Sequence, residues 1–130
     1  MDLFDGIRTL LAVRRYVDRP VPDAVIRKIL EAGRLTGSAM NLQPWHFIVI
    51  QDRETLRRLG ALARSGPYIA EAPLAIVVAI EKTGYAVSDA SRAIHSMLPT
   101  PGPEAAPGFV NQVPANTWAT ASPSSCRPRR

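Results

Sequence analysis

The sequence predicts a fold in which helices pack on a sheet, and two strongly apolar runs carry that prediction. Phe47–Ile50 is apolar throughout, and Pro73–Ile80 is apolar and rich in β-branched residues. Such runs are typical of strands that are buried on both faces. A segment of helical periodicity, Arg53–Arg64, separates them. The order strand, helix, strand predicts a parallel pair with a right-handed crossover if both strands share one sheet.

Four segments have the apolar spacing of amphipathic helices. The first lies near the N-terminus and includes Phe4 and Ile7, and the last spans Tyr85–Leu98. Pro22 and Asp23 open the second helix, because proline is tolerated in a first turn and aspartate is favourable near the positive end of the helix dipole. This second helix is expected to end at Gly33 or one turn later at Gly37. Asp52 is the expected N-cap of Arg53–Arg64, and Ser65, Gly66 and Pro67 end that helix.

Length and composition favour one ordinary domain without a membrane segment. The chain has 130 residues, of which 46% are hydrophobic, enough for one core. The N-terminus is acidic and lacks the basic and apolar regions of a secretory signal, and no apolar run approaches the ~20 residues of a membrane span. We therefore expect a soluble, cytoplasmic protein with no membrane partner.

Charge and metal-ligand patterns exclude two other classes of function. The net charge is +5, but basic residues are interspersed with acidic ones along most of the chain, and only Arg127–Arg130 forms a basic patch. Without a motif that reads nucleic acid, this distribution predicts no nucleic-acid partner. Cys126 is the single cysteine, and His46 and His95 lack close partners at ligand spacing. The sequence therefore predicts no disulfide within the chain and no metal site.

The composition changes abruptly at Pro99, so we divide the chain into a domain over residues 1–98 and a tail over residues 99–130. Seven of the twelve prolines lie in this tail, with Glu104 as its single acid. Two interpretations remain open. The tail is disordered, because such a composition cannot bury enough apolar surface to offset chain entropy, or it is an out-of-frame continuation of GC-rich coding DNA.

Five stretches, in order and at matching spacing, resemble the FMN-dependent nitroreductase family. They are Ala12–Tyr16 with Arg19–Pro22, Ile26–Ala32, Ser38–Trp45 followed by His46–Ile50, Glu71–Pro73, and Tyr85 with Asp89 and Ala90. The resemblance implies an α+β fold, a three-layer α-β-α sandwich that is incomplete at the C-terminus. It also implies an intertwined homodimer with FMN at the subunit interface. The implied reaction passes electrons from NAD(P)H through the flavin to a small-molecule acceptor such as a nitroaromatic or a quinone.

The resemblance assigns cofactor contacts to four residues, Arg14, Ser38, Asn41 and Gln43, and no catalytic acid or base. The Arg14 guanidinium suits the FMN phosphate, because it can bind phosphate oxygens in bidentate fashion. Asn41 both donates and accepts, as the polar edge of a flavin requires. Ser38 contacts the flavin or caps a helix, and Gln43 contacts the flavin or ties down the loop through a backbone bond. We expect Trp45 to be a core residue, and Asp89 to orient a helix terminus without taking part in the chemistry.

Three departures from the family pattern weaken the expected activity. Leu11 stands where the family usually carries a second cationic phosphate ligand, with Ala12 in place of a small hydroxyl. The lost contact would cost about 1.5–3 kcal/mol of FMN affinity, unless Arg8 compensates for it. Met40 replaces a small residue, commonly glycine. The tail also lacks counterparts of the family's later elements, so the alternative is a catalytically silent fragment that binds FMN weakly or pairs with a full-length relative.

Overall fold

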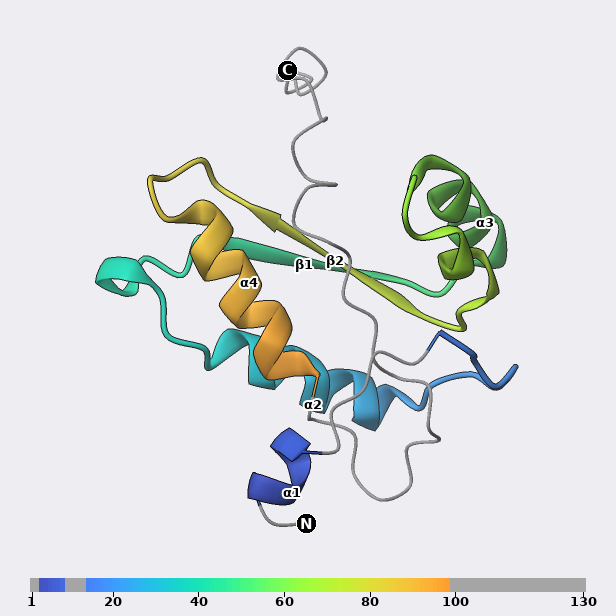
Figure 1. The fold of residues 1–130 in the computed structure, drawn as a ribbon, viewed down its shortest axis with the longest axis horizontal. Helices are drawn as coiled ribbons and strands as arrows, with labels where there is room; N and C mark the ends of the chain where they lie inside the picture. The colour runs from blue at the N-terminus through green and yellow to red at the C-terminus, as the bar shows by residue number, and fades with distance from the viewer. Residues whose placement is uncertain (1–2, 9–13, 99–130) are drawn as a thin grey trace.

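The computed structural model describes residues 3–8 and 14–98 (Figure 1). Leu11, Ala12 and the tail 99–130 therefore lie outside the described residues. The helices are α1 (Leu3–Arg8), α2 (Asp23–Arg34), α3 (Arg53–Leu62) and α4 (Ala86–Met97), with two short 3-10 turns, η1 (Ala39–Asn41) and η2 (Pro67–Glu71). The strands are β1 (Trp45–Ile50) and β2 (Ala75–Ile80). This mixture confirms the α+β class.

The two strands pair antiparallel, so the predicted parallel pair is wrong. Trp45 lies opposite Ile80, and Ile50 lies opposite Ala75. The connection between the strands is helical, as expected, but it does not cross back along the sheet. Instead α3 and η2 pack against each other at one end of the strands, and a Cβ on Gly60 would lie only 2.7 Å from the Ala70 nitrogen. The chain therefore leaves β1 and enters β2 at the same end, which forces the antiparallel arrangement.

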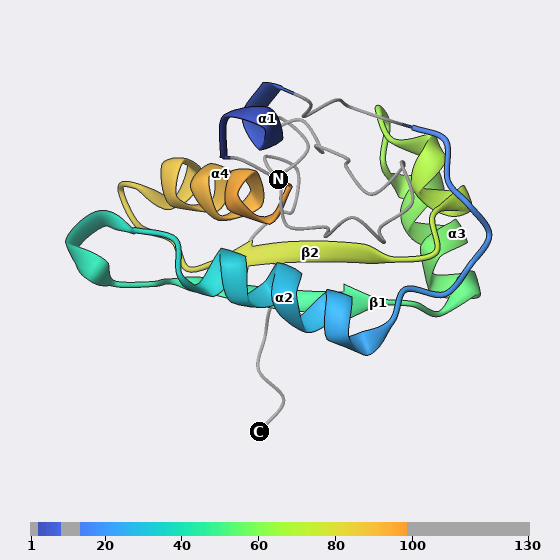
Figure 2. The same cartoon turned by 90° about the horizontal axis from the view of Figure 1, so that it is seen from below.

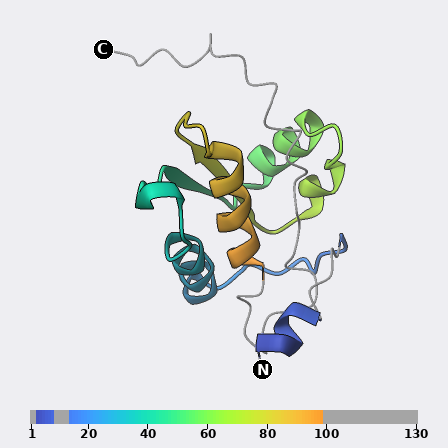
Figure 3. The same ribbon diagram turned by 60° about the vertical axis from the view of Figure 1, so that its left-hand side comes forward.

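Two helices cover one face of this sheet. Figure 1 shows α2 and α4 on the same side of the strands, and the turned view in Figure 3 shows α4 passing across them. The prediction that Phe47–Ile50 is buried on both faces is wrong within the part of the chain that the structure describes, because Ile48 on the other face is 50% exposed. The described helices cover a single face, and α3 reaches the sheet only at one end.

The core consists of two clusters of buried side chains. The larger joins α2 and α4 to the covered face of the sheet and comprises Ile29, Trp45, Val78, Ala90, Ala93 and Met97. Trp45 is thus a core residue, as predicted, and its ring stacks on Phe47 with centroids 6.3 Å apart. The smaller cluster joins α3 to η2 and comprises Leu56, Ala63 and Ile69.

The helix boundaries follow local chemistry closely. The Asp52 carboxylate accepts hydrogen bonds from the Thr55 backbone nitrogen at 2.8 Å and from the Thr55 hydroxyl at 2.6 Å, which confirms the predicted cap of α3. Helix α2 begins directly after Pro22 and ends at Arg34, between the two glycines expected to limit it.

Helix α1 presents Phe4 and Ile7 to solvent, with exposed fractions of 66% and 61%.

Candidate functional site

The loop Ser38–Gln43, between α2 and β1, has an unusual backbone. Met40, Asn41 and Gln43 have φ values of 52°, 54° and 51°. Residues with a side chain rarely adopt this left-handed region, at a cost of roughly 1–2 kcal/mol each, although asparagine tolerates it best. Such a conformation persists only when surrounding contacts fix it. The backbone also explains why a glycine would suit the position that Met40 occupies.

Side chains within the loop supply some of those contacts. The Ser38 hydroxyl oxygen accepts a hydrogen bond from the Gln43 backbone nitrogen at 2.9 Å, and the Gln43 amide nitrogen donates to the Asn41 side-chain oxygen at 3.0 Å. Ser38 precedes η1 but makes no side-chain capping bond to it. The Ser38 side chain thus ties down the loop at the Gln43 backbone, while the Gln43 side chain bonds that of Asn41. The structure thus brings Ser38, Asn41 and Gln43 together, with both amides exposed.

A carboxylate from a distant part of the chain also holds the loop. Asp89, in the first part of α4, is only 2% exposed, and its two oxygens lie 3.1 and 3.3 Å from the Ala39 backbone nitrogen. Ala39 is the first residue of η1, so Asp89 does hold a helix terminus, as expected, but the sequence did not indicate which one. A signal was present, since Asp89 falls on the same helical face as Ala90 and Ala93, and an acid within an apolar stripe needs a partner.

Arg14 lies on a segment fixed to the opposite end of the molecule. Its guanidinium carbon is 5.3 Å from the centre of the Tyr68 ring in η2. Nearby, Arg53 of α3 bonds the Asp18 carboxylate at 3.1 Å and lies 3.4 Å from the backbone oxygens of Ala70 and Ala72. These contacts hold residues 14–18 along η2 and leave Arg14 exposed.

Arg14 and the Ser38–Gln43 loop therefore do not meet within one chain. The loop leads into Trp45 at one end of β1, whereas η2 leads into Ala75, opposite Ile50 at the other end. Strands of this length span about 17–20 Å. Figures 1 and 2 show the two segments at opposite ends of the sheet.

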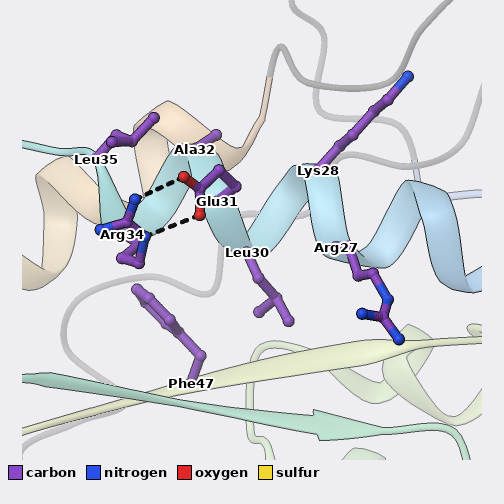
Figure 4. Close-up of a pocket in the computed structure, with 8 residues that line it drawn as sticks. All are labelled: Arg27, Lys28, Leu30, Glu31, Ala32, Arg34, Leu35 and Phe47. Atoms are coloured by element: carbon purple, nitrogen blue, oxygen red, sulfur yellow. Dashed lines mark hydrogen bonds and ion pairs between the residues drawn. The ribbon is translucent and has the colours of Figure 1, made fainter.

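An open groove lies elsewhere, between α2 and β1, with a volume of about 820 Å³. Figure 4 shows Leu30 pointing from α2 toward the strands, Phe47 pointing from β1 toward α2, and the ion pair of Glu31 and Arg34 on the helix above Phe47. The hydrogen bond from Arg34 holds the pKa of Glu31 below its usual value. None of the four predicted cofactor-binding residues lines the groove.

Within residues 3–8 and 14–98, no three His, Cys, Asp or Glu side chains are grouped so that they could hold a metal ion. The helices in these same ranges include none with both the length and the apolar character needed to span a membrane.

This chain is similar in sequence to proteins of a known family. A model of the nitroreductase family matches residues 8–121. The chain belongs to this family. A relative from Methanothermobacter thermautotrophicus, whose name includes NAD(P)H nitroreductase, is 37% identical over 103 residues, which are 75% of this chain and 54% of the relative. The chain spans about half or less of the length of the curated relatives it matches.

Solved structures of the family share the fold. An FMN-dependent nitroreductase from Clostridium difficile R20291 has 30% sequence identity and a TM-score of 0.73, over 75% of this chain and 59% of that protein. A nitroreductase with bound FMN from Bacteroides fragilis has 26% identity and a TM-score of 0.66, over 77% and 64% of the two chains. The family match continues past residue 98, and the division of the chain at that point stays a prediction.

Proposed function

We propose that this protein is an FMN-dependent oxidoreductase that passes electrons from NAD(P)H through the flavin to a nitroaromatic, quinone or similar small-molecule acceptor. The observation that carries the proposal is the Ser38–Gln43 loop, in which two exposed amide side chains lie on a left-handed backbone. Family membership supports the same function, because relatives include an FMN reductase from Bacillus subtilis and a nitroreductase with bound FMN.

The residues present fit the chemistry of FMN. Asn41 and Gln43 offer both donors and acceptors to the polar edge of a flavin ring, and Ser38 fixes the loop that carries them. Arg14 offers an exposed, planar guanidinium for a phosphate group. When bound, FMN supplies the hydride and electron chemistry, so the protein needs to provide only binding, orientation and electrostatic tuning. For this reason we assign no side chain the role of catalytic acid or base.

The proposed enzyme is a homodimer with composite sites. Arg14 and the Ser38–Gln43 loop lie at opposite ends of strands that span about 17–20 Å. One FMN that touches both is therefore held by Arg14 of one subunit and the loop of the other. We further propose that the enzyme works in the cytoplasm and has no nucleic-acid partner, as its mixed surface charge favours.

Flavin titration of the purified chain tests the proposal. We expect FMN fluorescence to be quenched on binding, the protein to be yellow, and NAD(P)H to be oxidised when a nitroaromatic or quinone is added. A colourless protein that leaves the fluorescence of added FMN unchanged would rule the proposal out.

A second candidate is a catalytically silent chain that pairs with a longer relative. The exposure of Phe4 and Ile7 on α1 favours it, because these apolar side chains find no cover in the residues described. Co-expression with a full-length relative distinguishes the two candidates. Recovery of a mixed complex that neither binds FMN through this chain nor oxidises NAD(P)H faster than the relative alone would support the silent role.

A further inference from the structure

We infer that Asp89 is a positioning residue that holds the Ser38–Gln43 loop in the conformation that presents Asn41 to the flavin. The inference rests on the proposed function for its link to FMN. That Asp89 fixes the conformation of the loop is inferred only from contacts between the described residues.

The contact joins two parts of the chain that are 50 residues apart. Asp89 lies on α4 and is 2% exposed, and its carboxylate oxygens lie 3.1 and 3.3 Å from the Ala39 backbone nitrogen. A buried carboxylate is costly unless it accepts hydrogen bonds, and one from a backbone N–H is stronger when the acceptor is charged. Asp89 and Ala39 therefore stabilise each other's positions.

Helix α4 gives Asp89 a rigid base. Its neighbours Ala90 and Ala93 are buried in the larger core cluster, together with Met97 one turn further on. The hydrogen bond to Asp89 fixes the loop to α4 at Ala39, one residue before the left-handed stretch begins. At the far side, the Pro44 backbone oxygen accepts a hydrogen bond from the Glu81 nitrogen at 2.9 Å. The strained residues Met40, Asn41 and Gln43 are thus bracketed between two tertiary contacts.

This arrangement explains how an unfavourable backbone persists. The three left-handed residues would relax toward ordinary φ values if nothing held them. Hydrogen bonds within the loop move together with the loop, so they oppose this relaxation less than a bond to another element does. Asp89 belongs to a different element and does not move with the loop. Weakening its bond should therefore release the loop while the core around α4 remains folded.

The test compares Asp89→Asn with Asp52→Asn. Both changes turn a carboxylate that accepts a backbone N–H into a neutral acceptor of the same shape, but Asp52 caps α3 and does not touch the loop. We expect Asp89→Asn to speed hydrogen exchange of the Ala39 amide in ligand-free protein and to raise the Kd for FMN about tenfold. Asp52→Asn should leave both unchanged, whatever its effect on thermal stability.

A second variant, in the loop, removes the same hydrogen bond and can be used if Asp89→Asn fails to fold. Ala39→Pro removes the donor from the other side, at the first position of a helical turn, where proline is tolerated. It leaves α4 intact and should raise the Kd for FMN to a similar degree.

The outcomes separate the inference from the proposed function. Unchanged Ala39 exchange in Asp89→Asn, or an equal rise in Kd in Asp52→Asn, would overturn the positioning role. If the wild-type chain binds no FMN, the proposed function fails, but faster Ala39 exchange in Asp89→Asn would still establish that Asp89 holds the loop.

Discussion

Arg14 is the residue on which the phosphate half of the proposed site depends. Its contact with Tyr68 is a cation–π interaction at the surface, which contributes only about 0.5–1 kcal/mol. A charged hydrogen bond to phosphate contributes more, about 1.5–3 kcal/mol. We therefore expect Arg14→Ala to raise the Kd for FMN roughly ten- to a hundredfold with little change in melting temperature. Fluorescence titration measures the first quantity and thermal unfolding the second.

Arg15 is the matched control, because it is the neighbouring arginine and is also exposed. Arg15→Ala should bind FMN almost as the wild type does. Equal losses of affinity in the two variants would indicate a general effect of positive charge and would contradict a specific phosphate contact.

Asp52 makes the stability of α3 dependent on pH. The hydrogen bond from the Thr55 hydroxyl, with that from its backbone N–H, holds the pKa of Asp52 below its usual value. A lowered pKa in the folded state means that the stabilisation is fully present above the unfolded pKa, about 4, and is lost as pH falls below it. The melting temperature of Asp52→Asn should therefore fall less between pH 7 and pH 3 than that of the wild type.

Thermal melts at the two pH values measure this difference. The lowered pKa of Glu31 acts in the same direction in both proteins, so it cancels in the comparison. An equal fall in melting temperature for wild type and variant would show that Asp52 does not contribute to the acid sensitivity.

Individual residues were predictable when their role was local. Asp52 caps α3 because a cap needs only the backbone N–H groups three residues on, and Trp45 is buried because it adjoins an apolar strand. The partner of Asp89 could not be predicted, because it is 50 residues away and is a backbone nitrogen. Backbone donors occur at every residue except proline, so their pairing with a distant acid leaves no mark in the sequence.

At the scale of elements, the close approach of α3 to η2 determines how the strands connect. A Cβ on Gly60 would lie 2.7 Å from the Ala70 nitrogen and 3.1 Å from the Pro67 oxygen, both backbone atoms that cannot turn aside. We expect Gly60→Ala to destabilise the fold by roughly 1–3 kcal/mol, less any gain from the helix propensity of alanine. Chemical denaturation measures this loss.

Two other glycines calibrate that result. A Cβ on Gly33 would meet the Met97 methyl carbon at 2.2 Å and the Phe47 ring at 3.0 Å. Both are side-chain atoms and the nearer one is the end of a flexible side chain, so Gly33→Ala should cost less than Gly60→Ala. Gly37 has no atom within 4 Å of the added Cβ and should tolerate alanine. A reversed order of stability would show that packing between α3 and η2 is looser than the contacts indicate.

At the scale of the whole molecule, the separation of Arg14 from the Ser38–Gln43 loop implies a site shared between two subunits. If each FMN is held by Arg14 of one subunit and Asn41 of the other, Arg14→Ala and Asn41→Ala subunits should complement each other. A mixed dimer of C2 symmetry then has one intact site and one doubly altered site, so random exchange restores about a quarter of the sites.

FMN binding before and after the two variants are mixed measures this recovery. Each variant alone provides the baseline, and a mixture of Arg14→Ala with itself controls for exchange. No recovery in samples where subunit exchange is demonstrated would contradict a composite site.

The sequence by itself determined the helices, the strands, the local caps and the loop that carries the candidate site, because these depend on propensities and spacings within a few residues. It also determined the family, through five stretches in matching order along the chain. Only the tertiary structure decided that β1 and β2 run antiparallel, that one face of the sheet is covered by described helices, and that Asp89 grips the loop at Ala39. It also placed Arg14 at the far end of the sheet from its expected partners. These features depend on packing between distant segments, where α3 against η2 and α4 against the loop fix the path of the chain.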